Sequence, residues 1–125
     1  MKYIRRAIED IVEKSSKTFK TVLITGARQT GKSTLIRHKY SDIKEVTFDD
    51  PFAEEQAKNN AEMFMSLNEP PVFFDEIQYV PDLFRHIKQS CDLHDEKGLY
   101  FLSGSQPFKL MEMASDSLAG RVSIS

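Results

Sequence analysis

Four residues near the amino end of the chain have the spacing GxxxxGK(S/T): Gly26, Gly31, Lys32 and Ser33, within GARQTGKS. In such a loop the glycines let backbone N–H groups turn towards phosphate oxygens, and the lysine pairs with the β and γ phosphates. The serine hydroxyl can ligate Mg²⁺, which prefers oxygen donors. The segment therefore predicts a site for a nucleoside triphosphate with Mg²⁺. The predicted contacts are Gly26, Ala27, Arg28, Gln29, Thr30, Gly31, Lys32, Ser33 and Thr34.

Two consecutive carboxylates, Asp75 and Glu76, follow the apolar run PVFF. If this run is a buried strand, successive side chains point in opposite directions, and Asp75 can face the metal while Glu76 lies nearer the γ-phosphate. Asp75 then contacts Mg²⁺, normally through water, and Glu76 orients or deprotonates the attacking water. The alternative interpretation is a solvated strand end or a helix cap.

Other polar residues have two interpretations each. A polar turn is predicted after Leu102, and Ser103, Ser105 or Gln106 in it could sense the γ-phosphate or hold the lytic water; the alternative is a plain turn. Arg28 either adds a second cation near the phosphates or has a partner on the surface or at a sheet edge. The acidic pair before Pro51 could be further metal ligands, but it has the pattern of a helix cap, which we favour.

The elements that must position these residues alternate between strand and helix. Strands are expected over residues 21–25, 45–49, 71–74, 98–102 and 121–125. Helices are expected over residues 3–15 and 32–39, as one or two short helices over 52–67, and from 81 onwards with Leu83, Phe84, Ile87 and Cys91 inside. This alternation predicts an α/β fold in which a parallel sheet of about five strands has helices on both faces. Its carboxyl edge is where ligands bind in such folds.

Composition narrows the class of protein. A chain of 125 residues is the size of one domain, and 17 Lys and Arg against 19 Asp and Glu give no global electrostatic case for nucleic acid or membrane. The single Cys91 is expected to be a core residue rather than a catalytic thiol. No apolar run approaches a membrane span, so a cytoplasmic location is expected. Residues 1–20 should form a helix packed on the core, and the bare strand edge near Ser125 suggests a fragment of a longer protein.

Five segments together resemble the AAA-type P-loop ATPase core of a bacterial and archaeal ATP-binding protein family: RQTGKSTLIR, FDDP, VFFDEIQYVPDLF, FLSGSQ and SLAGR. The resemblance runs from about Leu23 to Ile124. It implies a three-layer sandwich with strand order 5-1-4-3-2, and a C-terminal domain of unknown role in longer members. It also implies nucleotide and Mg²⁺ binding by Lys32 and Ser33, Walker B residues at Asp75 and Glu76, and a sensor-1 region over residues 103–106.

The same resemblance puts Arg121 where AAA-type proteins have an arginine finger that reaches a neighbour's nucleotide. This role requires a homo-oligomer, and the alternative is a structural ion pair. We expect Mg²⁺-dependent ATP hydrolysis, with Glu76, Lys32, Ser105, Gln106 and Arg121 as its catalytic residues. A slow or non-hydrolysing nucleotide switch is the alternative, a small-molecule kinase is less favoured, and a GTPase is disfavoured because the sequence has no NKxD.

Overall fold

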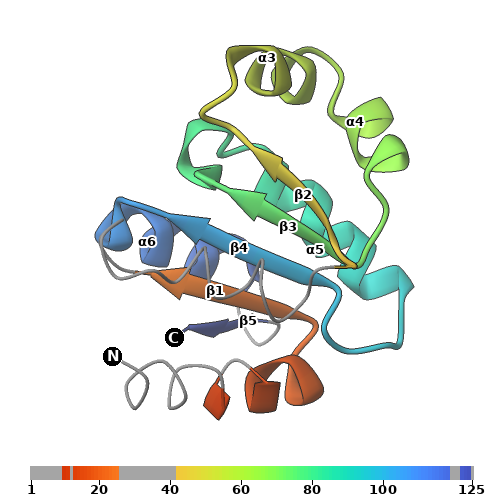
Figure 1. Ribbon diagram of the computed structural model, residues 1–125, viewed down its shortest axis with the longest axis vertical. Coiled ribbons are helices and arrows are strands. Elements are labelled where there is room, and N and C mark those ends of the chain that lie inside the picture. Colours follow the sequence, from red (N-terminus) through yellow and green to blue (C-terminus); the bar gives the residue numbers. More distant parts are fainter. Residues whose placement is uncertain (1–9, 12, 26–41, 119–121, 125) are drawn as a thin grey trace.

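A parallel sheet of five strands forms the centre of the computed structural model, which describes residues 10–11, 13–25, 42–118 and 122–124. The spatial order is β2-β3-β4-β1-β5, and Figure 1 shows all the arrows running the same way. This confirms the predicted α/β class, the five strands and the order 5-1-4-3-2. The strands are β1 (Thr21–Thr25), β2 (Lys44–Thr47), β3 (Val72–Asp75), β4 (Tyr100–Gly104) and β5 (Val122–Ile124).

The register of the strands aligns their carboxyl ends. Thr47 at the end of β2 is opposite Asp75 at the end of β3, and the last residue of β1 is opposite Gly104 at the end of β4. Because all four pairings are parallel, these strands leave the sheet at the same edge. Gly26 is the next residue in the sequence after β1, so the chain enters the predicted phosphate loop from this edge.

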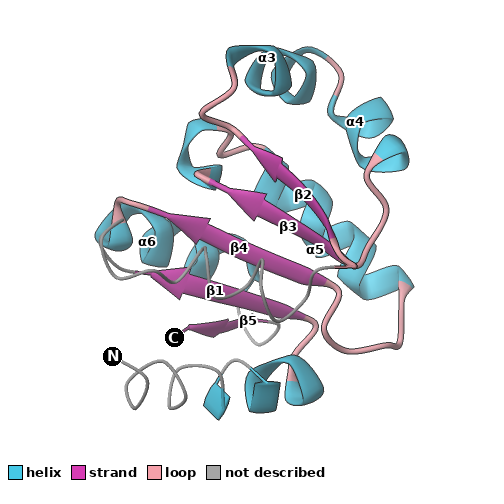
Figure 2. Ribbon diagram, in the orientation of Figure 1, coloured by secondary structure: helices cyan, strands magenta, loops and turns pink. Residues whose placement is uncertain are grey.

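The two faces of the sheet carry separate apolar clusters. Two helices, α5 (Leu83–Leu93) and α6 (Pro107–Leu118), lie behind the sheet in Figure 2. They pack on Val72, Phe74, Tyr100, Leu102 and Leu23, and the predicted inner face of α5 is confirmed. The opposite face holds Val22, Ile24, Phe73 and Phe101, which are also buried. The helix predicted over residues 32–39 lies outside the described residues.

Two short helices follow β2, which ends two residues earlier than predicted. They are α3 (Pro51–Asn59) and α4 (Ala61–Leu67), and Figure 2 shows them beyond the β2 side of the sheet. The side chain of Asp50 accepts from the backbone N–H of Phe52 at 3.0 Å, so the cap interpretation holds for Asp50. Asn60 separates the helices because its side chain caps α4 by accepting from the backbone N–H of Met63 at 3.2 Å.

An aromatic cluster anchors the carboxyl end of β3. The ring centroids of Phe48 and Phe74 are 5.8 Å apart, and Phe64 from α4 lies 5.6 Å from Phe48 and 5.8 Å from Phe74. Tyr100 continues the cluster 6.0 Å from Phe74. Such pairs contribute about 0.5–1.5 kcal/mol each beyond the area that they bury. The cluster therefore fixes Phe74, and with it the neighbouring Asp75, against β2 and β4.

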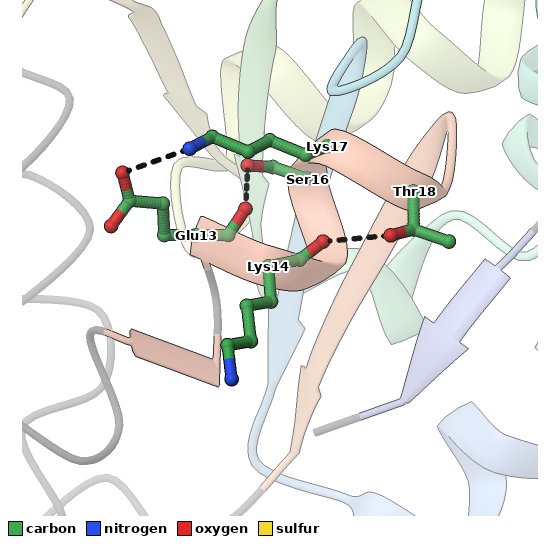
Figure 3. A network of polar contacts seen from close by, with 5 residues as sticks. All are labelled: Glu13, Lys14, Ser16, Lys17 and Thr18. Carbon is green, nitrogen blue, oxygen red and sulfur yellow. Dashed lines mark hydrogen bonds and ion pairs between the residues drawn. The ribbon is translucent and has the colours of Figure 1, made fainter.

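The segment before β1 is helical over residues 10–11 and 13–18, so this helix ends three residues later than predicted. Figure 3 shows its last turns, where the Ser16 hydroxyl donates to the carbonyl of Glu13 and the Thr18 hydroxyl donates to the carbonyl of Lys14. Most of its predicted apolar stripe lies outside the described residues, and Ile11 is 52 % exposed. Its packing on the core stays a prediction. No helix among the described residues is long and apolar enough to span a membrane.

Backbone hydrogen bonds at Gly98 and Leu99 connect the segment before β4 to the residues that follow this helix. The backbone N–H of Gly98 donates to the carbonyl of Phe19 at 2.9 Å, and Leu99 donates to the carbonyl of Lys20 at 2.8 Å. The φ angle of Gly98 is 67°, and a Cβ there would lie 3.0 Å from the backbone oxygen of Ser16. The carbonyl of Leu99 accepts from the backbone N–H of Val72 at 3.1 Å, and β4 begins at Tyr100, two residues later than predicted.

Candidate functional site

Hydroxyl groups from both neighbouring strands hold the Asp75 carboxylate at the carboxyl edge of the sheet. Ser103 from β4 donates to Asp75 Oδ1 at 2.6 Å, and Thr47 from β2 donates to Oδ2 at 3.3 Å. Asp75 is 9 % exposed and Ser103 is 4 % exposed. Because the donors come from the strands on both sides, the registers of β2, β3 and β4 set the position of this carboxylate.

Glu76 leaves the strand in an unusual backbone conformation. Its φ and ψ angles are 55° and 46°, and it is the only non-glycine residue with positive φ in the part of the chain that the structure describes. The left-handed region costs about 1–2 kcal/mol for a residue with a Cβ, and such strain is often found at functional sites. The prediction that Asp75 and Glu76 point in opposite directions as consecutive strand residues is therefore wrong, because β3 ends at Asp75. The side chain of Glu76 is directed by this turn, followed by a short 3₁₀ helix, η2 (Ile77–Tyr79).

Two donors converge on one oxygen of Glu76. Gln78 Nε2 in η2 donates to Glu76 Oε2 at 2.5 Å, and the hydroxyl of Ser105 donates to the same atom at 3.0 Å. Glu76 is 3 % exposed and Gln78 is 2 % exposed. A carboxylate has about four acceptor positions on two oxygens, so two donors on Oε2 are compatible with further contacts. The arrangement fixes a buried acid directly beside Asp75.

Gly104 lets the chain pass closely over Gln78. A Cβ at Gly104 would overlap Gln78 Oε1 and would also meet the Leu110 side chain in α6. Gln78 Oε1 itself is buried and accepts no hydrogen bond from the described residues. The end of β4 is thus shaped around the amide of Gln78.

The polar turn predicted after Leu102 is partly strand. Ser103 and Gly104 belong to β4, where they pair with Ile24 and Thr25 of β1. The Asp75 carboxylate satisfies the buried Ser103 hydroxyl. Ser105 lies in the connection to α6 and contacts Glu76. The Gln106 side chain is exposed and makes no hydrogen bond to a described residue, while its carbonyl accepts from Leu110 N at the start of α6.

The remaining predicted site residues lie outside the described residues. These are Arg121 and the nine predicted nucleotide contacts: Gly26, Ala27, Arg28, Gln29, Thr30, Gly31, Lys32, Ser33 and Thr34. The roles of all the site residues stay predictions. The structure brings together Asp75, Glu76, Ser103 and Ser105, and it does not bring the side chain of Gln106 into this group.

Sequence reasoning missed two residues of the cluster, Thr47 and Gln78. Thr47 was missed because the order of the strands does not fix their register: the sequence predicts a strand that ends at residue 49, whereas β2 ends at Thr47, opposite Asp75. Gln78 belongs to the DEIQ segment. If the strand continued through Glu76, as predicted, nothing would indicate a contact between the side chains of Gln78 and Glu76. Only the left-handed turn brings the amide back to the carboxylate.

The donors around Asp75 match the chemistry of a magnesium site. Its carboxylate and the hydroxyls of Ser103 and Thr47 are oxygen groups, which Mg²⁺ prefers. Magnesium sites commonly use one or two carboxylates together with phosphate oxygens, rather than a cage made wholly of protein. The residues present therefore fit a Mg²⁺ ion shared with a bound nucleotide.

Two hollows lie apart from this cluster. One, of about 330 Å³, lies between α3 and α4 and is lined by Phe52, Met63 and Leu67 among others. The second, of about 440 Å³, is lined by residues that include His86, His94 and Tyr100. Tyr100 begins β4, so the second hollow lies near the amino edge of the sheet. Neither hollow is lined by Asp75, Glu76 or Gln78.

Comparison with known proteins identifies the family. A family model described as an AAA domain matches residues 18–125, which is most of the chain. The chain belongs to the AAA domain family. This is a family of nucleotide-binding ATPases with a P-loop NTPase fold, and the match includes both the phosphate loop and the Asp75–Glu76 pair.

Similar proteins are longer than this chain. An uncharacterised protein of Mycobacterium bovis and one of Mycobacterium tuberculosis are each 36 % identical to it over 107 residues. Those matches cover 82 % of this chain and 24 % of each relative. A crystal structure of a DNA replication initiation factor matches with a TM-score of 0.60 and 17 % identity, over 95 % of this chain and 44 % of that one. The structural match supports the fold alone, and the chain spans about a quarter of the length of the mycobacterial relatives.

Proposed function

We propose that this AAA domain binds ATP with Mg²⁺ and hydrolyses it, with Glu76 as the general base. The observation that carries the proposal is the paired arrangement at the carboxyl edge of the sheet. Asp75 is held by hydroxyls from two strands, and Glu76 is held beside it by Ser105 and Gln78. The strand that leads into the GARQTGKS loop ends at the same edge. Ligands bind at this edge in open α/β sheets.

The phosphate loop and Asp75 are assigned to nucleotide binding. Backbone N–H groups of residues 26–31 would cradle the phosphates, and Lys32 would pair with the β and γ phosphates. Ser33 and Asp75 would hold Mg²⁺, Asp75 through water. When bound, the ion neutralises charge that develops on the phosphate oxygens. These assignments rest on the motif and on the oxygen donors around Asp75.

Glu76 is assigned to the water that attacks the γ-phosphorus. The water oxygen forms a bond to phosphorus as the bond from phosphorus to the β–γ bridging oxygen breaks, and the products are ADP and inorganic phosphate. The carboxylate of Glu76 orients the water and accepts its proton. Ser105 and Gln106 are assigned to the γ-phosphate side of the site, and Arg121 to the nucleotide of a neighbouring copy.

Single-turnover hydrolysis of ATP, with the protein in excess over nucleotide and Mg²⁺ present, tests the role of Glu76. The Glu76→Gln variant keeps the shape of the side chain but cannot accept the proton, so the rate should fall by roughly 10²–10⁴-fold. Its affinity for ATP should change by less than about threefold. The matched control is Glu112→Gln, an identical change at an exposed position on α6, which should leave the rate unchanged.

Nucleotide binding tests the phosphate loop separately. Lys32→Ala removes the cation assigned to the phosphates and should weaken ATP binding by about 10–100-fold. Lys109→Ala, at an exposed position on α6, is its control. Tight binding by the parent chain without hydrolysis would overturn the ATPase proposal and favour a nucleotide switch. Unchanged binding by Lys32→Ala would overturn the assignment of the loop.

A further inference from the structure

We infer that Gln78 is a positioning residue that holds the Glu76 carboxylate in place for catalysis. The inference rests on the proposed function, because it assigns a purpose to Gln78 only if Glu76 acts on the attacking water. Three observations support it: a direct contact between the two side chains, an unsatisfied oxygen on the Gln78 amide, and a glycine opposite that amide.

The contact between Gln78 and Glu76 depends on a turn that follows β3 directly. Glu76 has φ 55° and ψ 46°, and η2 follows directly, so the side chain two positions later lies beside the Glu76 carboxylate. Gln78 Nε2 then donates to Glu76 Oε2. Ser105 approaches the same oxygen from the connection between β4 and α6. Donors from two separate segments restrict the rotation of the Glu76 side chain more than either could alone.

The unsatisfied oxygen indicates which end of the Gln78 amide sets its orientation. Gln78 is 2 % exposed, and its Oε1 receives no hydrogen bond from the described residues. A buried acceptor without a donor is destabilising, and an apolar side chain of the same size would avoid this penalty. Rotating the amide would not help, because Oε1 would then face the Glu76 carboxylate. The orientation of the amide is therefore set by its N–H contact with Glu76.

Gly104 provides the space that this orientation needs. A Cβ at position 104 would overlap Gln78 Oε1, so a larger residue would push the amide away from its present position. The Gln78 amide can therefore occupy its position only because residue 104 is a glycine. In this position the amide delivers an N–H donor to Glu76.

The test replaces Gln78 with Met, which has a similar size and removes both the donor and the unsatisfied oxygen. Steady-state ATP hydrolysis and thermal unfolding are measured on the 125-residue chain. We expect kcat to fall by about 10–100-fold, because small misplacements of a reacting group have effects of this size. KM for ATP should change by less than about threefold, and the melting temperature should stay within about 5 °C. Gln89→Met, at an exposed position on α5, is the control and should change none of these values.

The same Gln78→Met change, made in the Glu76→Gln variant, distinguishes this inference from the proposed function. In Glu76→Gln, the further change Gln78→Met should have less than about a twofold effect on the residual rate, because the base that it positions is gone. A parent chain without hydrolysis, or a Glu76→Gln variant with the parent rate, overturns the proposed function and this inference with it. If Glu76→Gln is inactive while Gln78→Met retains the parent kcat, only the inference about Gln78 is overturned.

Loss of folding in the Met variant would not leave the question open. Gln78→Glu keeps the shape of the side chain but replaces its N–H group with an oxygen that faces Glu76. It should lower kcat by at least as much as Gln78→Met, again with a small change in KM. A loss of kcat that merely follows the loss of folded protein in both variants would assign Gln78 a structural role and refute the inference.

Discussion

Replacing Gly104 with Ala adds one methyl group at the place where the candidate site has no room for it. The added Cβ would meet Gln78 Oε1 and the Leu110 side chain, and both of these residues are buried. Leu110 is packed in the hydrophobic core, whereas the amide at the end of the Gln78 side chain is held by its hydrogen bond to Glu76. We therefore expect the amide to be displaced and its hydrogen bond to Glu76 to break.

The size of the effect follows from these contacts. Inserting a methyl group into a packed region destabilises a protein by about 1–3 kcal/mol. One kcal/mol corresponds to roughly 2–8 °C in melting temperature across small and medium domains. A loss of about 2 kcal/mol should therefore lower the melting temperature by roughly 4–16 °C. The displaced amide should also lower kcat for ATP by about tenfold or more, as expected for a misplaced reacting group.

Gly98→Ala is the matched control, because it introduces the same methyl group with a similar penalty at the other edge of the sheet. Gly98 has φ 67°, a region that costs about 1–2 kcal/mol for alanine, and its Cβ would lie 3.0 Å from the backbone oxygen of Ser16. It precedes β4, whereas Gly104 ends it. The variant should lose comparable stability and keep the parent kcat.

The assay compares kcat of the two variants well below both melting temperatures, with the folded fraction measured by circular dichroism in the same buffer. Equal kcat values per folded molecule for Gly98→Ala and Gly104→Ala would refute the reasoning. So would a Gly104→Ala variant as stable and as active as the parent, because the predicted overlap would then be relieved without moving the amide.

Three further predictions concern stability. Asp50→Ala removes the N-cap of α3 and should lower the free energy of unfolding by about 1 kcal/mol in a urea titration, whereas Asp50→Asn should retain most of it. Burial raises the pKa of Tyr100 above its ordinary 10.0. Because the folded state holds this proton more tightly, the contribution of Tyr100 to stability should be constant below about pH 10 and decline as the pH rises further. Tyr100→Phe should remove that decline, and it should lose about 1 kcal/mol at neutral pH with the hydrogen bond to Ser90. The thiol of Cys91 is buried, so labelling by a thiol reagent should follow the unfolding transition, and rapid labelling of the native chain would contradict this placement.

The order of the strands could be predicted because several independent signals agree. Short apolar runs such as TVLIT alternate with amphipathic segments, and the family resemblance supplies the order 5-1-4-3-2. The ends of the elements could not be predicted to the residue, since they depend on contacts between distant residues. The strand β4 runs on through Ser103, which pairs with Ile24 and donates its hydroxyl to Asp75, and no property of serine alone predicts a buried strand position.

The position of Asp75 was predictable in outline, but its partners were not. An acidic residue after an apolar strand indicates the carboxyl edge of a parallel sheet, and the observed end of β3 agrees. Thr47 is brought to Asp75 only by the register between β2 and β3. The sequence contains many threonines and serines beside predicted strands, so their residue types alone do not single out the one that meets this carboxylate.

The two carboxylates of the site are supported in different ways, and this difference explains why Glu76 needs Gln78. Asp75 is the last residue of a strand, so its neighbours in β2 and β4 supply hydroxyls through the sheet register. Glu76 lies beyond the ladder, and its described donors come from η2 and from the connection that follows β4. Its left-handed backbone turns the following residues back, and the amide two positions later donates to its carboxylate. The spacing of the DEIQ segment is therefore a structural requirement: a donor one position earlier or later would lie on a different side of the 3₁₀ turn.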